Sequence, residues 1–119
     1  MNPPRALTCT TTAVDGGTAH VAISGDITYD SGDRLPAAVA ELLAAHPVRH
    51  LHLDLTDLGF CDSSGLGALL TVLRATTAVG AELHLDNRPP SLDRLLRRTR
   101  TYDHLTRAAR QERKERLDH

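Results

Sequence analysis

Residues 51–73 read LHLDLTDLGFCDSSGLGALLTVL, and this stretch decides the fold. In its first five residues leucine alternates with polar residues, so the leucines point to one side of an extended chain. Its last part spaces leucines from Leu66 to Leu73 by three and four residues, which is the period of an amphipathic helix. The stretch therefore predicts a strand, a loop and then a helix that begins near Ser63.

The residues before this stretch predict a hairpin and a helix. Residues 7–14 are rich in threonine, and the turn sequence Asp-Gly-Gly at 15–17 joins them to an alternating segment at 20–24. From Leu35 the apolar period becomes helical, and Pro47 forbids its continuation. Two antiparallel strands and one helix are therefore expected ahead of the central strand.

The residues after it predict one more strand and one more helix. Gly80 is typical of a helix end, and beyond it Leu83 and Leu85 alternate with polar residues. Residues 88–90 (Arg-Pro-Pro) form a loop, and Ser91 is the expected N-cap of a short amphipathic helix.

This order of elements, β-β-α-β-α-β-α, predicts an α/β domain in which an N-terminal hairpin feeds parallel strands through helical crossovers. Each strand keeps one polar face, whereas a sheet covered on both faces would show continuous apolar runs. The helices are therefore expected on one face of a mixed sheet, which excludes a doubly wound nucleotide-binding sheet.

Composition limits the classes of function. The 119 residues are 40% hydrophobic and 24% charged, which fits one soluble domain. Aromatic residues are only 3%, which argues against a surface that stacks nucleic-acid bases. Cys9 and Cys61 make neither a disulfide framework nor a zinc motif. With no secretory signal at the start and no membrane span, we expect a cytoplasmic protein without membrane insertion.

Charge is distributed unevenly along the chain. Residues 1–85 hold four basic and nine acidic side chains, and residues 86–119 hold ten and six. The arginines of the second part could contact nucleic acid, but their acidic neighbours favour a solvated helix face. Residues 107–119 have almost no apolar side chain, so we expect a domain at 1–106 and a charged tail or frayed helix at 107–119.

The loop and helix start at 62–67, Asp-Ser-Ser-Gly-Leu-Gly, resembles the STAS domain of bacterial anti-sigma factor antagonists. The resemblance extends over about residues 7–105. It implies a mixed sheet of four to five strands with helices packed on one face, which agrees with the alternation above. The family commonly has a fifth strand, whereas here residues 99–102 (Thr-Arg-Thr-Tyr) lead into the charged tail.

The resemblance implies a phosphorylation switch at Ser63. In that family the serine directly after the motif's aspartate is phosphorylated by a kinase that is also the anti-sigma factor. The unphosphorylated protein would bind this anti-sigma factor and so release a sigma factor, and a phosphatase would reset the switch. ATP would be bound by the kinase, so we expect no cofactor here. A phosphoryl group adds roughly −1.5 to −2 charge, which a helix N-terminus tolerates.

Other residues of the motif receive roles by the same resemblance. Asp62 is expected to cap the helix and organise the loop, and Ser64 belongs to the same partner surface. Gly65 and Gly67 would keep side chains away from the approach to the serine, and Leu66 either anchors the helix or helps form the docking surface. By themselves these residues also fit an ordinary helix start, because Asp and Ser are preferred caps.

One position departs from the family. The family has a Gly-Glu-Leu-Asp-like run after its second strand, and residues 25–28 are Gly-Asp-Ile-Thr. Thr28 therefore stands where an aspartate is expected, and Asp26 or Asp30 would have to supply the carboxylate. This departure motivates an alternative function, a non-switching STAS adaptor subunit of a transporter or signalling scaffold.

The sequence also raises two other possible functions, a metal or pH-sensing site and a hydrolase. His20, His50, His52 and His84 share the polar side of the predicted strands and could form a metal or pH-sensing cluster. No histidine and carboxylate spacing of a known metal site accompanies them, so solvated histidines and no metal are favoured. A hydrolase reading of Ser63 lacks a Gly-x-Ser-x-Gly elbow and a base, so we expect no enzyme.

Overall fold

The computed structural model describes residues 6–28, 30–99 and 105. Its elements are β1 (Thr8–Asp15), β2 (Thr18–Ile27), α1 (Arg34–Ala45), β3 (His50–Cys61), α2 (Ser63–Ala78), β4 (Glu82–Asp86) and α3 (Pro90–Arg98). This is the order predicted from the sequence. The predicted tail at 107–119 and its boundary at 106 lie outside the described residues.

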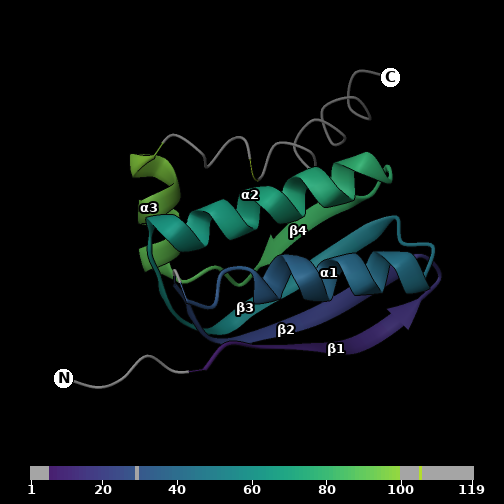
Figure 1. Cartoon of the computed structure of the whole chain (residues 1–119), viewed down its shortest axis with the longest axis horizontal. Coiled ribbons are helices and arrows are strands. Elements are labelled where there is room, and N and C mark those ends of the chain that lie inside the picture. The colour runs from purple at the N-terminus through teal and green to yellow at the C-terminus, as the bar shows by residue number, and fades with distance from the viewer. Residues whose placement is uncertain (1–5, 29, 100–104, 106–119) are drawn as a thin grey trace.

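The four strands form one mixed sheet in the order β1-β2-β3-β4. β1 and β2 pair antiparallel, whereas β2 with β3 and β3 with β4 pair parallel. Helices α1 and α2 lie side by side over one face of this sheet (Figure 1). The predicted α/β class, the hairpin followed by parallel strands and the single covered face are confirmed.

The core lies between the sheet and these helices. Leu51, Leu53 and Leu55 of β3 are 0% exposed, which confirms the alternation in the sequence. Burying one such side chain stabilises a fold by roughly 1.5–3 kcal/mol. Neighbouring elements contribute further fully buried aliphatic residues, which are Ile23, Ile27, Leu35, Val39, Leu69, Leu83, Leu92, Leu96 and Leu105.

The start of α3 differs from the prediction. The helix begins at Pro90, with Pro89 as N-cap and no side-chain capping bond, so the expectation that Ser91 is the N-cap is wrong. Proline suits the first helical position because the N–H that it lacks would have no partner inside the helix. Arg88 closes this end by donating from Nε to Asp93 over 2.7 Å.

Strand β3 contains two bulges after its regular first half. From the pair Ala22–Asp54 to the pair Ser24–Asp57, β2 advances by two residues and β3 by three. The same shift occurs from the pair Gly25–Leu58 to the pair Ile27–Cys61. A bulge turns the following side chains to the other face of a sheet. As a result Cys61 packs against the core, and Phe60 faces solvent with 58% of its surface exposed.

Candidate functional site

The candidate site begins at the cap of α2. Asp62 has an extended backbone, and its carboxylate oxygen Oδ1 accepts a hydrogen bond from the N–H of Gly65 over 2.8 Å. The carbonyl oxygen of Asp62 accepts from the N–H of Leu66 over 3.0 Å. This is a side-chain N-cap, so the capping role predicted for Asp62 is confirmed.

Ser63 is the first residue of this 16-residue helix, and it is exposed. Ser64 follows in the same turn. The N-terminus of a helix carries a partial positive charge, because its first N–H groups have no acceptor inside the helix. A negatively charged group on the Ser63 side chain would therefore be tolerated by the helix itself.

The two glycines of the motif have different surroundings. Gly65 is buried, and a Cβ atom there would lie 2.5 Å from the carbonyl oxygen of Ile27 and 2.9 Å from Sγ of Cys61. Gly67 is exposed, with nothing within 4 Å of an added Cβ. Gly65 is thus required for the close packing of α2 on β2, whereas Gly67 leaves the surface next to the serine open.

Leu66 takes one of the two roles left open by the sequence. Its side chain is only 6% exposed and belongs to the core. It therefore anchors α2 to the sheet.

Asp26 links the ends of β2 and β3 beneath this loop. Its Oδ1 accepts a hydrogen bond from the backbone N–H of Phe60 over 2.7 Å. That bond holds the bulged end of β3 in place and presents the Phe60 ring to solvent two residues before Asp62. The sequence did not predict that Phe60 is exposed. The available signal was that Phe60 is the one phenylalanine of the chain and directly precedes Cys-Asp-Ser.

Thr28 belongs to the turn that follows β2. Its N–H donates to Oγ of Ser31 over 3.1 Å, and the Ser31 hydroxyl donates to the carbonyl oxygen of Asp26 over 3.0 Å. Oγ1 of Thr28 lies 3.4 Å from the same Ser31 oxygen. Thr28 and Ser31 therefore fix the backbone of the turn with neutral hydroxyl groups, where the resemblance would put a carboxylate.

Cys61 lies under the motif as a protonated thiol. Burial, and secondarily the negative charge of Asp62, raises its pKa from 9.0 to about 11. Its Sγ donates to the carbonyl oxygen of Asp62 over 3.6 Å. A thiol in this state is a poor nucleophile, because the thiolate is the reactive form.

An exposed serine at a capped helix start, beside an exposed phenylalanine and on a sheet covered on one face, can be compared with known families. The family described as "Mlab, STAS domain" matches residues 10–112, which is most of the chain. The chain belongs to the STAS domain family. This STAS domain is 30% identical over 80 residues to the anti-sigma F factor antagonist of Paenibacillus polymyxa, which corresponds to 67% of this chain and 68% of that relative.

Solved structures agree with this assignment of the fold. The anti-sigma factor antagonist from Mycobacterium paratuberculosis has a TM-score of 0.68 at 24% identity, covering 89% of this chain and 87% of that one. The sulfate transporter family protein from Wolinella succinogenes has a TM-score of 0.68 at 20% identity, covering 81% and 77%. The Bacillus cell fate determinant SpoIIAA in its phosphorylated form has a TM-score of 0.62 at 20% identity, covering 79% and 85%.

The family match and the antagonist relative identify this STAS domain as a member of the anti-sigma factor antagonist family. Within the part of the chain that the structure describes, no helix has both the length and the apolar character needed to cross a membrane.

Proposed function

We propose that this protein is a cytoplasmic anti-sigma factor antagonist whose binding is switched off by phosphorylation of Ser63. In the unphosphorylated form it captures an anti-sigma factor that has serine kinase activity, and a sigma factor is thereby released. The observation that carries the proposal is the exposed Ser63 at the first position of α2, next to its N-cap Asp62.

The surface around Ser63 supports docking of a protein. Phe60 offers an exposed apolar ring, and aromatic side chains are common anchors of protein interfaces. The backbone beneath the ring is held by Asp26, and the helix start is held by Asp62. A rigid surface with one apolar anchor binds a partner without a large cost in conformational entropy.

The same geometry explains how a phosphate would end binding. It would add roughly −1.5 to −2 charge beside the carboxylate of Asp62. Burying that charge in an interface that is built around an aromatic anchor costs free energy unless the partner supplies a cation. Helix α2 accommodates the phosphate, whereas the complex does not, and a phosphatase is needed to restore binding.

We propose a binding role and no catalysis, with no cofactor of its own and no direct nucleic-acid contact. The carboxylates of Asp62, at the start of α2, and of Asp26, at the end of β2, accept backbone N–H groups from Gly65 and Phe60 respectively. These roles are structural, and ATP for phosphorylation of Ser63 would be bound by the kinase partner.

The test compares three variants for affinity to a purified anti-sigma factor kinase of the native host. In the presence of ATP and Mg²⁺, Ser63→Ala cannot be phosphorylated at this position and should keep the affinity of the unphosphorylated protein. Ser63→Asp should bind at least tenfold more weakly. Thr77→Asp is the control, because Thr77 is exposed on the same helix about 21 Å further along its axis. Equal affinities of Ser63→Ala and Ser63→Asp would contradict the switch.

A second candidate is a non-switching STAS adaptor in a larger assembly. It is favoured by Thr28, which replaces the carboxylate of the family pattern with a hydroxyl group in the turn after β2. The likeness in fold to a sulfate transporter family protein is compatible with it. An adaptor would keep its partner when Ser63 carries charge, so the Ser63→Asp measurement separates the two functions.

A further inference from the structure

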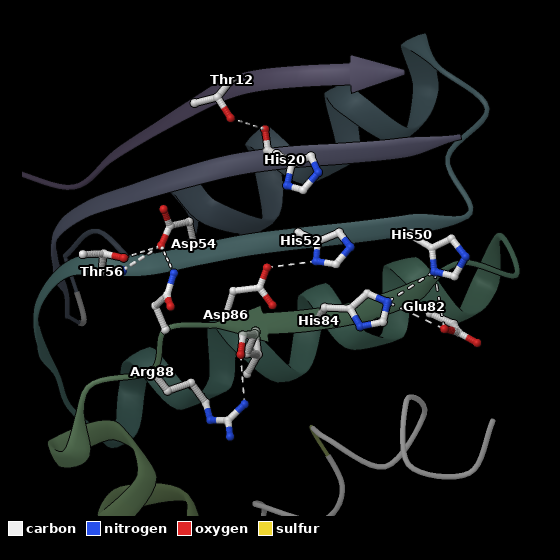
Figure 2. A network of polar contacts seen from close by, with 12 residues as sticks. Thr12, His20, His50, His52, Asp54, Thr56, Glu82, His84, Asp86 and Arg88 are labelled. Carbon is white, nitrogen blue, oxygen red and sulfur yellow. Dashed lines mark hydrogen bonds and ion pairs between the residues drawn. The ribbon is translucent and has the colours of Figure 1, made fainter. Parts of the chain in front are cut away.

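The face of the sheet opposite α1 and α2 carries a group of polar side chains from β2, β3 and β4 (Figure 2). Three of them, His50, Glu82 and His84, turn toward one another. Their ligand atoms, one imidazole nitrogen from each histidine and one carboxylate oxygen, all lie within 4.8 Å of one another. We propose that these three side chains form a binding site for a divalent transition-metal ion of the zinc class, separate from the Ser63 site.

The distances fit tetrahedral coordination. Nδ1 of His50 lies 3.2 Å from Nε2 of His84, and Oε2 of Glu82 lies 3.4 Å from the former and 3.6 Å from the latter. Ligands bound to Zn²⁺ at about 2.0–2.1 Å in a tetrahedron are separated by about 3.3–3.4 Å. An ion can therefore reach all three atoms with shifts of a few tenths of an ångström.

The ligand types also fit. Two imidazoles and one carboxylate are a common set of protein ligands for zinc, with water in the fourth position. The side chains of His50, Glu82 and His84 are 39%, 24% and 20% exposed. The site is thus open enough for an ion and a water molecule to enter, and sheltered enough to strengthen the interaction with a charge.

The pairing of β3 with β4 creates this arrangement. His50 stands directly opposite Glu82 in the parallel register, and His84 lies two residues along β4 on the same face. The sequence shows no metal-ligand spacing because the ligands come from two different strands, and His50 precedes Glu82 by more than thirty positions in the chain. A bound ion would tie the edge strand β4 to the inner strand β3.

The ring of His84 is oriented by its neighbour. His52 stacks on it with the ring centroids 4.4 Å apart and the planes at 12°, and Nδ1 of His52 lies 2.9 Å from a carboxylate oxygen of Asp86. His20 stacks on the other side of His52 with the centroids 4.7 Å apart. Such packing behind a ligating histidine fixes its ring plane, as outer contacts do in metal sites.

The test titrates Zn²⁺ into the tag-free full-length protein after EDTA treatment and dialysis, with calorimetry for binding and melting for stability. We expect one ion per chain and a rise in Tm of roughly 8–16 °C at a Zn²⁺ concentration about a hundredfold above Kd. Co²⁺ in place of Zn²⁺ should give the visible absorption of a four-coordinate site.

Substitutions of the three proposed ligands test whether these side chains bind the ion. Glu82→Gln and His84→Gln should each weaken Zn²⁺ binding at least tenfold and abolish most of the Tm rise, and His50→Gln serves the same purpose if either variant fails to fold. His46→Gln is the matched control, because His46 is an exposed histidine at the end of α1, away from this face of the sheet, and supplies none of the three ligand atoms. Absence of binding at micromolar Zn²⁺, or binding unchanged in these ligand variants, would overturn the proposal.

Discussion

Gly65 of α2 meets the end of β2 so closely that a Cβ atom on Gly65 would lie 2.5 Å from the carbonyl oxygen of Ile27. The helix start and the strand end thus contact each other through their backbones. Ser63 lies two residues before Gly65 at the start of the same helix, so this contact fixes the position of the serine relative to the sheet.

Gly65→Ala should therefore destabilise the protein. The added methyl group meets backbone and the Cys61 sulfur, and overpacking of this kind costs about 1–3 kcal/mol. Gly67→Ala is the control, because its methyl group enters open space and alanine is the better helix former by about 0.5–1 kcal/mol. Urea denaturation should show opposite signs for the two variants, and equal changes in the free energy of unfolding would refute the close contact.

Asp62→Ala should lower the free energy of unfolding by about 0.5–2 kcal/mol, the usual cost of losing a side-chain N-cap. The lost interaction is the 2.8 Å hydrogen bond from the Gly65 N–H to the carboxylate. Asp62→Asn should lose much less, because the amide oxygen can accept the same bond. If the two variants are equally destabilised, the charge of Asp62 and not its capping bond is what stabilises the loop.

Phe60→Ala should weaken binding of the anti-sigma factor at least tenfold and change stability by no more than about 0.5 kcal/mol, since the ring is 58% exposed. Val79→Ala is a suitable control, because Val79 is 55% exposed at the far end of α2. The affinities are measured by calorimetry with the purified partner. Unchanged affinity of Phe60→Ala would remove the ring from the docking surface.

The partly buried Cys61 thiol should make the free energy of unfolding fall as pH rises from about 9 to 11. Below pH 9 the thiol is protonated in both the folded and the unfolded chain. Between the ordinary pKa of 9.0 and the folded pKa of about 11, the unfolded chain loses this proton and the folded protein keeps it. Chemical denaturation across this range should give a shallower decline for Cys61→Ala than for the unsubstituted protein, and equal slopes would contradict the raised pKa.

The site was predicted in part from the sequence. The cap residue Asp62, the helix start at Ser63 and the strand before them follow from local chemistry, because capping and periodicity involve residues close together in the chain. The exposure of Phe60 does not follow, because the alternation of β3 holds only as far as Leu55. Beyond that point, bulges that depend on pairing with β2 decide which way each side chain faces.

By itself, the sequence determined the order of the elements, the buried leucines of β3 and the polar opposite face of the sheet, since side-chain periodicity records which side of an element is buried. The tertiary structure alone decided that Gly65 is needed for packing against Ile27 and that His50 meets Glu82 and His84. These relationships join residues far apart in the chain. They depend on strand register and on helix position, which are set only when the whole sheet and its covering helices pack together.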